Sequence, residues 1–563
     1  MLDSCINMKR TFIRLSLVAI HAESNSAFYP LGIASIAAYL DQFMKKAGGQ
    51  LPKLEITMIE NCGKELTAQR IVDSKPDIVG FSLYAWNTKR VFQLAREIRN
   101  SESSPCLVAG GPDAEYCAAL FRDSSRLNEK TAEIPFDVVF LGEAEKSFAH
   151  WVLDEFIGGT VSLRQDKPKF IPSILCEPEE LVSPWLAGYL VPSAERNVAW
   201  EMTRGCPYHC TYCYEGRGNA RVRALPKKRL EAELELFEKQ SVPKVFVLDP
   251  TFNLKPARAL AMIEMLAKKA PSIYWYLEIR AELINPAMAE AFARLSCSLQ
   301  IGLQSANPVV LKTVGRSIDR KLFAEKIRFL NQAQAVFGLD LIYGLPFDSL
   351  ASFFESLDFA LSLQPNHLDI FPLAVLPGTV LYNQRKEFDL DAESDPPYML
   401  RQHPGFSRND MQKAGKVAKA CEIFYSRGRA VPWFLAVLKP LKLKPSRFFI
   451  ECLECLKEQD WKHQSMAHWQ IEELQIAALR EIYRLKKKDK LLPAVLDLVR
   501  YFGALSRAYA EQERSRITLT YPLADIESGF LLSHIERYCE RHQPMLEKID
   551  ISPSKNGPIV KIL

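Results

Sequence analysis

Strand-like and helix-like segments alternate from residue 12 to about residue 400 of this 563-residue chain, and this order limits the fold more than any other feature. Short apolar runs, such as residues 77–83 and 106–109, alternate with stretches that have the apolar period of an amphipathic helix, such as 89–99. Buried strands separated by helices form a doubly wound parallel sheet, whose ligands bind at the carboxyl ends of the strands. Over residues 1–150 we therefore expect a Rossmann-like domain of the α/β class.

A second alternation begins after residues 151–195, which contain scattered prolines and no clear period and therefore indicate a linker. Within residues 196–400 the candidate strands are 198–202, 244–248, 274–278, 298–302, 336–342 and 369–372. Six such strand–helix units predict a partial (β/α)6 TIM barrel, with its active site at the C-terminal ends of the strands.

Helical periods dominate residues 401–563, and strand signals are absent there. The expected helices are 409–426, 445–459, 466–485 and 491–511. We expect this mainly helical region to close the barrel and to supply much of the substrate pocket.

Composition narrows the class of protein. Hydrophobic residues make up 48% of the chain, and a formal net charge of +5 over this length gives no reason to expect binding to nucleic acid. No apolar run reaches the roughly 18–20 residues of a membrane span, and no cleavable signal pattern is present. Thirteen cysteines without a secretion signal indicate reduced thiols, so we expect a cytoplasmic protein.

One group of cysteines is tight enough to be a ligand set on spacing alone. Cys206, Cys210 and Cys213 lie in MTRGCPYHCTYC, directly after the first strand of the second alternation. Three thiolates on one loop can ligate three irons of a cubane 4Fe–4S cluster and leave the fourth iron open to substrate. A structural zinc site would need a fourth protein ligand. No second CxxC or CxxH follows closely, and His209 lies inside the loop.

The pattern CxxxCxΦC, with Tyr212 as its aromatic residue, resembles the signature of the radical S-adenosylmethionine (SAM) superfamily. In that family the amino and carboxylate groups of SAM chelate the open iron. The resemblance implies further SAM contacts at the ends of the barrel strands, although ordinary barrel-end polarity explains any one of them alone. The implied SAM-binding residues are Tyr212, Asp249, Thr251, Asn253, Glu278, Arg280, Gln304, Ser305, Ile342 and Gly344.

The first alternation resembles the cobalamin-binding domain of cobalamin-dependent radical SAM enzymes. The corrinoid pattern places a serine after the third strand and a glycine pair after the fourth, and here Ser82 precedes Gly110 by 28 positions. Glycine lets the backbone approach the nucleotide tail closely. The implied cobalamin-binding residues are Ser82, Leu83, Tyr84, Trp86, Asn87, Gly110, Gly111, Pro112, Gly142 and Glu143. The alternative is a degenerate sheet that no longer binds cobalamin.

One departure from the corrinoid pattern concerns the lower face of cobalt. Other corrinoid proteins carry Asp-x-His-x-x-Gly after the first strand, and its histidine coordinates the metal. His21 lies near that place, but Ala19 and Ser24 stand where the aspartate and glycine would be. We therefore expect a lower face without a histidine ligand. Trp86 is the first candidate to cover that face, because an indole excludes water but does not coordinate cobalt; the alternative is simple loop packing.

A second cysteine pair, Cys452 and Cys455, forms a CxxC that could seed an auxiliary cluster with Cys421 and Cys539. We favour an amphipathic helix in which these cysteines are small buried hydrophobes.

The resemblance implies a cobalamin-dependent radical SAM methyltransferase that uses methylcobalamin and a 5′-deoxyadenosyl radical to methylate an unactivated carbon. It also implies an external one-electron reductant of the flavodoxin or ferredoxin type. One alternative keeps both cofactors but performs a cyclisation or rearrangement without methyl transfer, and another is a non-catalytic corrinoid carrier or sensor. The sequence does not select a small-molecule or peptide substrate. It selects no catalytic acid or base either, although Tyr425, His463, His468 and Tyr483 are plausible.

Overall fold

The chain folds into two compact units, each assembled from separate segments of sequence. A computed structural model describes residues 11–22, 28–48, 51–61, 65–102, 105–122, 134–159, 167–215, 221–456, 466–555 and 557–563. The first unit comprises residues 1–278, 294–297 and 374–399, and the second comprises residues 279–293, 298–373 and 400–563. The limits predicted for the three domains and the linker stay predictions.

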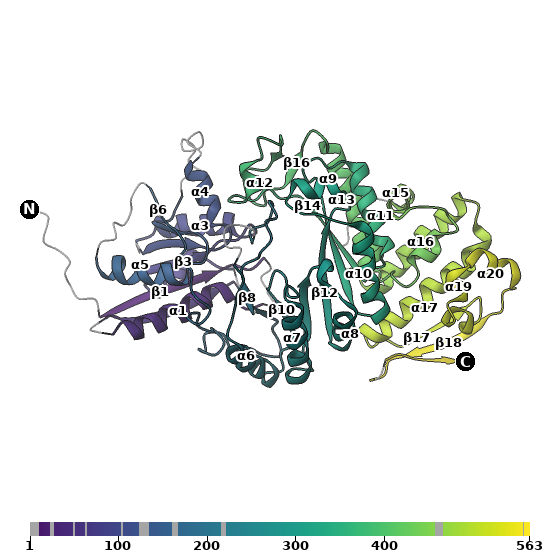
Figure 1. Cartoon of the computed structure of the whole chain (residues 1–563), viewed down its shortest axis with the longest axis horizontal. Helices are drawn as coiled ribbons and strands as arrows, with labels where there is room; N and C mark the ends of the chain where they lie inside the picture. The colour runs from purple at the N-terminus through teal and green to yellow at the C-terminus, as the bar shows by residue number, and fades with distance from the viewer. Residues whose placement is uncertain are drawn as a thin grey trace, which may run out of the picture. The chain divides into compact units, whose positions relative to one another are not determined.

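The first unit contains a six-stranded parallel sheet in the order β2-β1-β3-β4-β5-β6. Its strands are β1 (Phe12–Ala19), β2 (Lys53–Glu60), β3 (Ile78–Ser82), β4 (Cys106–Gly110), β5 (Val138–Phe140) and β6 (Lys169–Ile171). Helices α1 (Leu31–Ala47) and α5 (Glu145–Trp151) pack together on one face, and α3 (Thr88–Arg99) and α4 (Ala114–Arg122) cover the other (Figure 1). Because both faces are covered, β3, β4 and β5 are almost continuously buried. The predicted doubly wound sheet is confirmed.

The strand order reverses between β1 and β3. In open α/β sheets the ligand binds in the crevice outside the strand ends at such a reversal. Residues that follow β1 and β3 therefore lie where a ligand of this fold is expected.

The second sheet has the order β14-β13-β12-β11-β10-β7, so its strands succeed one another along the chain as in an open barrel. They are β7 (Val198–Trp200), β10 (Lys244–Val247), β11 (Tyr274–Ile279), β12 (Cys297–Gln304), β13 (Phe337–Tyr343) and β14 (His367–Pro372). The connecting helices include α6 (Lys227–Lys239), α7 (Pro256–Lys269), α8 (Pro286–Arg294), α10 (Arg320–Ala333) and α11 (Leu350–Ser362). The predicted six-stranded partial barrel is confirmed.

The C-terminal part of the second unit is mainly helical, as predicted. Its long elements are α13 (Arg408–Cys421), which continues into the π-helix η3 (Glu422–Arg427), α15 (Pro445–Cys455), α16 (His468–Leu485) and α17 (Leu492–Ala510). Aromatic side chains form the centre of its core, with Phe424, Phe434, Phe448 and Phe449 in mutual ring contact. Among the residues that the structure describes, no helix is both long and apolar enough to cross a membrane.

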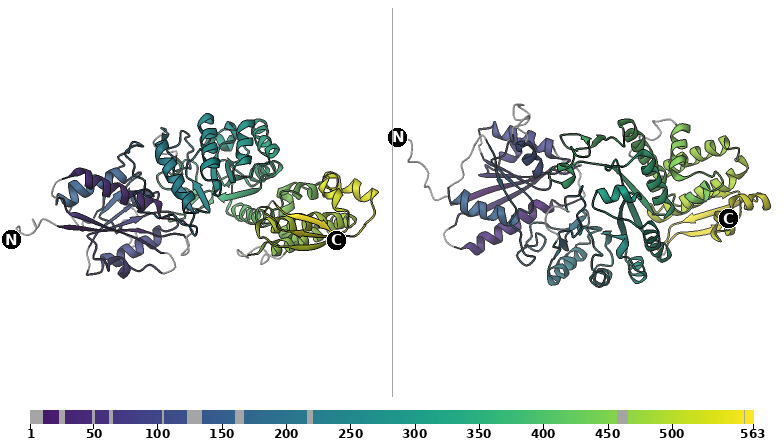
Figure 2. Two further views of the ribbon diagram at one scale, coloured as in Figure 1. Left: turned by 90° about the horizontal axis from the view of Figure 1, so that it is seen from below. Right: turned by 45° about the horizontal axis from the view of Figure 1, so that its top comes forward.

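The expectation of no strands beyond residue 400 is wrong. A three-stranded antiparallel sheet is formed by β17 (Ser515–Leu519), β18 (Glu547–Ser552) and β19 (Ile559–Ile562), and it packs against α17 (Figure 2). The strands are short, and in Ser-Arg-Ile-Thr-Leu of β17 the exposed positions are polar. An antiparallel sheet can leave one face open to solvent, so its strands can form with only weakly alternating apolar residues. A search for continuous apolar runs does not detect such strands.

Candidate cofactor site

The three motif cysteines lie on one loop in the first unit. The loop leaves β7 through the short strand β8 (Thr203–Arg204), which pairs with β9 (Arg223–Ala224). Gly205 has φ +90°, a conformation that favours glycine, and so turns the chain directly before Cys206. Cys206, Cys210 and Cys213 are all half-buried, and the Cys213 N–H donates to the Cys210 carbonyl at 3.1 Å.

The chemistry of this donor set fits a cubane cluster. Within the described ranges, no three His, Cys, Asp or Glu side chains converge on a single ion position. In a 4Fe–4S cluster each thiolate ligates a different iron, so the three sulfur atoms need not meet at one point. Their partial exposure leaves the loop open on one side, as a fourth iron that receives SAM requires.

Asp249, at the end of β10, fixes the start of the cluster loop. Its Oδ1 accepts the N–H groups of Met202 at 2.8 Å and Thr203 at 2.9 Å, and the side chain is fully buried. Burial raises the pKa of Asp249, and the donating N–H groups offset part of that effect. Its Oδ2 has no hydrogen-bond partner, and the Arg258 guanidinium lies 4.0 Å away. No sequence pattern predicted this loop-holding role.

The other predicted SAM residues of the first unit lie at the ends of neighbouring strands. The Phe252 N–H donates to the Glu278 carbonyl at 2.8 Å, which joins the ends of β10 and β11. Thr251 and Asn253, on either side of Phe252, are both buried. The pKa of Glu278 is raised, first by desolvation and then by the negative charge of Glu215.

In the second unit the predicted SAM residues differ in whether their side chains already have hydrogen-bond partners within the protein. Arg280 donates to Glu282 at 2.6 Å, and the Ser305 hydroxyl accepts the Asn307 N–H at 3.1 Å. Gln304 is different, because its amide Oε1 is buried without a hydrogen-bond partner. An orphaned buried acceptor of this kind indicates a missing polar partner.

Ile342 and Gly344 continue the same part of the second unit. Ile342 is half-buried at the end of β13, where an apolar contact was predicted. Gly344 has φ +83°, and a Cβ there would come within 2.8 Å of Leu400. Close packing therefore explains this glycine without a ligand.

At the reversal of the first sheet, Asn87 joins the ends of two strands. This fully buried side chain accepts the Tyr84 N–H at 2.8 Å and donates to the carbonyls of Ile20 at 3.0 Å and Ser82 at 3.1 Å. Its hydrogen-bonding capacity is thus used to shape the loop. The Ser82 hydroxyl makes only a long contact, 3.4 Å, with the Val18 carbonyl.

Trp86 lies on the loop that Asn87 shapes. Its ring stacks on Tyr84 with centroids 4.3 Å apart and planes 15° apart, yet the side chain is 59% exposed. Burial and then the Glu201 carboxylate raise the pKa of Tyr84. One indole face is therefore supported and the other is accessible, which fits a flat apolar ligand such as a corrin ring.

The predicted glycine pair packs against this loop. The Leu83 N–H donates to the Gly110 carbonyl at 2.7 Å. Gly111 has φ +106°, and a Cβ there would lie 2.8 Å from the Leu83 oxygen. Gly111 therefore permits close backbone contact between the loops after β3 and β4, with Pro112 directly following.

Sequence reasoning missed a partly buried ion-pair cluster that connects the loop after β5 to the cluster loop. Arg204 pairs with Glu143 at 3.2 Å, and with Glu145 and Glu201 at 2.8 Å each, while Glu143 also pairs with Arg223. Burial opposes the charge of Arg204, but the three carboxylates raise its pKa well above the usual value. The nearest signal was Arg204 two residues before Cys206 and the Gly142-Glu143 turn, which were not connected to each other.

Glu143 is thus committed to ion pairs, and its predicted contact with cobalamin stays a prediction. Gly142, directly before it, has φ +75° and lets the chain turn toward Arg204. His21 is committed as well, because its Nε2 lies 2.8 Å from Glu60, which also pairs with Arg196 at 3.0 Å.

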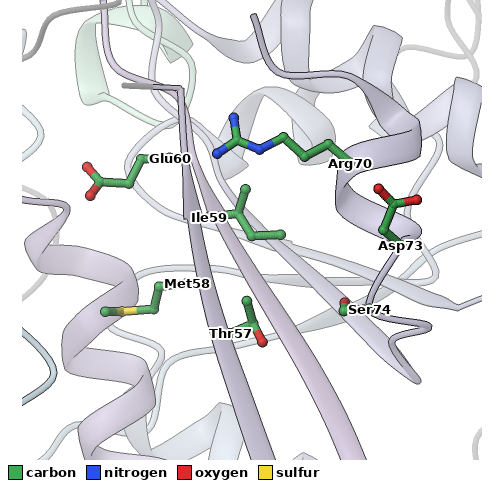
Figure 3. Close-up of a pocket in the computed structure, with 7 residues that line it drawn as sticks. All are labelled: Thr57, Met58, Ile59, Glu60, Arg70, Asp73 and Ser74. Atoms are coloured by element: carbon green, nitrogen blue, oxygen red, sulfur yellow. The ribbon is translucent and has the colours of Figure 1, made fainter. Parts of the chain in front are cut away.

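A surface hollow beside β2 and α2 (Ala68–Val72) does not include the predicted site (Figure 3). None of the predicted site residues lines it. Its lining residues are Thr57, Met58, Ile59, Glu60, Arg70, Asp73 and Ser74.

The remaining cysteines and the acid–base candidates lie elsewhere. Cys452 is fully buried in α15, and burial raises its pKa well above the usual value. The hydroxyls of Tyr425 and Tyr483 are buried and donate to backbone carbonyls. His468 is also buried, and His463 lies outside the described residues.

Comparison with known protein families agrees with both halves of this site. Residues 17–152 match the B12 binding domain, and residues 200–360 match the radical SAM superfamily. The chain is 25% identical over 366 residues to the cobalamin-dependent radical SAM methyltransferase TokK of Streptomyces tokunonensis, which covers 59% of this chain and 52% of TokK. This protein belongs to the cobalamin-dependent radical SAM enzymes. The two family matches confirm the predicted cofactor set of a 4Fe–4S cluster, SAM and cobalamin.

A second relative and a solved structure extend the comparison. The 2-(S-pantetheinyl)-carbapenam-3-carboxylate methyltransferase of Streptantibioticus cattleyicolor is 26% identical over 418 residues, 67% of this chain and 58% of that enzyme. The chain thus spans little more than half the length of these two relatives. The solved structure of the cobalamin-dependent SAM radical enzyme OxsB, with aqua-cobalamin and SAM bound, shares the fold with a TM-score of 0.53 and 15% identity. That match covers 93% of this chain and 83% of OxsB.

Proposed function

We propose that the protein is a methyltransferase that transfers a methyl group to an unactivated carbon of a small-molecule or peptide substrate. The observation that carries the proposal is the ion-pair cluster around Arg204. It ties the strand that precedes Cys206 to the turn after β5 of the B12-binding sheet within one compact unit. Two relatives, which match 59% and 67% of this chain, are named methyltransferases. A carrier without catalysis would not need its corrinoid domain fastened to a cluster loop.

The protein's own groups would hold the cofactors and exclude water. Cys206, Cys210 and Cys213 would ligate three irons, and the unpaired Oε1 of Gln304 would accept a hydrogen bond from SAM. When bound, the cofactors supply the chemistry: SAM cleaved at the cluster provides a hydrogen-abstracting radical, and cobalamin carries the methyl group. Asp249 would keep the cluster loop in position through its two backbone contacts.

On the cobalamin side, we assign Trp86 to the lower face of the corrin. Its accessible indole face would exclude water without donating a ligand to cobalt, and Tyr84 supports it from behind. His21 is not assigned as that ligand, because Ala19 and Ser24 replace the aspartate and glycine of the corrinoid pattern around it. Backbone near Gly110 and Gly111 would approach the nucleotide tail, where the absence of side chains leaves room.

The proposal includes an electron donor and a compartment. A one-electron reductant of the flavodoxin or ferredoxin type would reduce the cluster. We place the reaction in the cytoplasm, because the half-buried motif cysteines must remain reduced to bind iron. The mainly helical region beyond residue 400 would contribute to the substrate pocket.

An anaerobic preparation from cells supplied with cobalamin tests this function. We expect about four irons and one cobalamin per chain, as the cluster and corrinoid chemistry requires. With SAM and a strong reductant we expect 5′-deoxyadenosine, and with substrate a product heavier by one methylene and labelled from methyl-labelled SAM. Cys210→Ala is the matched control that should lose iron and SAM cleavage but keep cobalamin.

The possible results separate the alternatives. A product of unchanged carbon count would replace methyl transfer by cyclisation or rearrangement. Cobalamin binding without SAM cleavage under reduction would leave a corrinoid carrier or sensor. Iron and SAM cleavage without cobalamin would exclude the methyl-carrier step.

A further inference from the structure

One chain segment outside the predicted site contacts both cofactor loops. Residues 374–399, which follow β14 in sequence, belong to the first unit together with the B12-binding sheet and the cluster loop. Within this segment lies the short helix α12 (Val380–Asn383). Its Leu381 N–H donates to the carbonyl of Thr211, between Cys210 and Tyr212, at 2.8 Å. This contact fixes the middle of the cluster loop to the segment.

At its other end the segment reaches the corrinoid side through Tyr398. The Tyr398 hydroxyl lies 2.8 and 2.9 Å from the two carboxylate oxygens of Asp113 and donates to them, and both side chains are 1% exposed. Asp113 directly follows the Gly110-Gly111-Pro112 turn. Burial, and then the Asp113 carboxylate, raise the pKa of Tyr398, so its hydroxyl keeps its proton and remains a donor.

Asp113 also forms hydrogen bonds with the neighbouring loop. The Thr88 hydroxyl donates to the same carboxylate at 2.5 Å, and Thr88 follows Trp86 and Asn87 at the start of α3. The Asp113 N–H donates to the Leu83 carbonyl at 3.1 Å. One buried carboxylate therefore holds the loops after β3 and β4 together, and Tyr398 holds that carboxylate.

Three further contacts show that the Tyr398 end of the segment is fixed. The Tyr116 hydroxyl, on α4, donates to Asp395 at 2.8 Å, and its ring centroid lies 5.8 Å from that of Tyr398. The Val375 N–H donates to the Tyr398 carbonyl at 2.9 Å, which closes the segment on itself. The segment is thus anchored at the corrinoid loops and at the cluster loop.

We propose that Tyr398 and Asp113 are a positioning pair for cobalamin, which holds the loop bearing Trp86 and the glycine-pair loop in their binding conformation. This inference rests on the proposed function only through the identity of the corrinoid ligand. When the loops of a binding site are ordered before the ligand binds, less of the binding free energy is lost in ordering them. Removing the hydroxyl would leave the buried Asp113 carboxylate short of a donor and let the two loops separate.

The test compares Tyr398→Phe with Tyr483→Phe. Both remove a hydroxyl from a fully buried ring, but the Tyr483 hydroxyl donates to the Val437 carbonyl in the helical region of the second unit. For each anaerobic protein, hydroxocobalamin is titrated to obtain a dissociation constant. Iron per chain, 5′-deoxyadenosine formation and the melting temperature of the cobalamin-free protein are measured in parallel.

We expect Tyr398→Phe to raise the dissociation constant for cobalamin by about tenfold or more, the effect of one lost hydrogen bond to a buried acidic group. Iron content, SAM cleavage and melting temperature should match those of Tyr483→Phe. Asp113→Asn keeps an oxygen that accepts from Tyr398, so its dissociation constant should fall between those of the wild type and Tyr398→Phe.

Two results would overturn the proposal that Tyr398 and Asp113 position cobalamin. One is a Tyr398→Phe protein that binds cobalamin within twofold of the wild type. The other is a loss of iron and of melting temperature as large as the loss of cobalamin, which would indicate general destabilisation. A wild-type protein that binds no cobalamin would instead overturn the proposed function itself, so the two failures are distinguishable.

Discussion

Buried polar groups have different structural roles in two regions of this molecule. At the strand ends of the first sheet, Asn87 and Asp113 connect segments that are far apart in sequence. The partly buried Arg204, in β8, connects the cluster loop to the turn after β5. In the helical region beyond residue 400, Gln475 and Asp497 instead bind the backbone of adjoining helices and turns. The first set shapes the surface where the cofactors are proposed to bind, and the second set holds the scaffold.

This difference predicts that substitutions in the two regions have different effects. Substitution at the strand ends should change cofactor binding, with a stability cost that depends on whether charge is left unpaired. Substitution of Gln475 or Asp497 should change the free energy of unfolding and leave the affinity for cofactors unchanged, because the hydrogen bonds described for these two side chains involve no predicted site residue. Four substitutions test the comparison, from the largest expected effect to the smallest.

Arg204→Met should have the largest effect. It leaves the carboxylates of Glu143, Glu145 and Glu201 close together without their shared cation, and breaking a buried pair in this way costs about 3–5 kcal/mol. We expect a lower denaturant midpoint together with loss of iron and cobalamin, measured by chemical unfolding and cofactor analysis. Arg221→Met is the control, since the exposed Arg221–Glu177 pair should contribute little. Equal effects in both variants would remove the special role of Arg204.

Gln475→Leu tests the scaffold side. The Gln475 amide donates to the carbonyls of Phe424 at 2.7 Å and Gly428 at 3.0 Å, where η3 ends. Two buried acceptors without donors should lower the free energy of unfolding by about 2–4 kcal/mol. The dissociation constant for cobalamin should not change. Glu473→Leu, at an exposed position on the same helix, controls for helix effects, and a weakened cobalamin affinity in Gln475→Leu alone would break the comparison.

The position of the candidate site residues at strand ends was largely predictable from the sequence, because the signals for it are local. The spacing of Cys206, Cys210 and Cys213 and the place of Ser82 and Gly110 at strand ends depend only on residues close in sequence. The partners that organise the site were not predictable in this way. Tyr398 lies 285 positions from Asp113, and Arg204 lies 61 positions from Glu143, so nothing local connects them.

In the helical region the helices were predictable from the sequence, but the small sheet was not. Its long helices have the period of 3.6 residues that sequence reasoning detects, and α16 and α17 lie within about two residues of the predicted limits. The sheet of β17, β18 and β19 was missed because its strands alternate weakly and because β17 pairs with β18 about 30 positions away. Asp497, which binds the N–H groups of Thr520 and Tyr521 just after β17, contributes to holding that sheet against α17.

Asp497→Asn tests this contribution through its pH dependence. Burial raises the pKa of Asp497 from 3.8 to about 6, and the two N–H donors offset part of the rise. The folded protein therefore binds a proton more tightly than the unfolded chain, and stability falls as pH rises from about 4 to about 6. The asparagine variant lacks this titration. Its free energy of unfolding relative to the wild type should increase across that window by on the order of 1–3 kcal/mol.

Melting temperatures of the two proteins between pH 4 and pH 8 check this prediction. A difference that does not change with pH would show that Asp497 keeps an ordinary pKa in the folded state. Cobalamin affinity should be the same in both proteins, since Asp497 lies in the helical region.

Trp86→Ala should have the smallest effect on stability and an effect on cobalamin that the scaffold variants lack. Because the indole is 59% exposed, its removal should change the free energy of unfolding by no more than about 0.5 kcal/mol beyond the lost stacking on Tyr84. Water should then reach the lower face of cobalt, and the electron paramagnetic resonance and visible spectra of bound cob(II)alamin should shift. Trp469→Ala removes a similarly exposed indole from α16 and should leave both spectra unchanged. If Trp86→Ala also left them unchanged, the loop would hold Trp86 for packing alone, and the strand ends would shape the site through Asn87 and Asp113 without the aromatic ring.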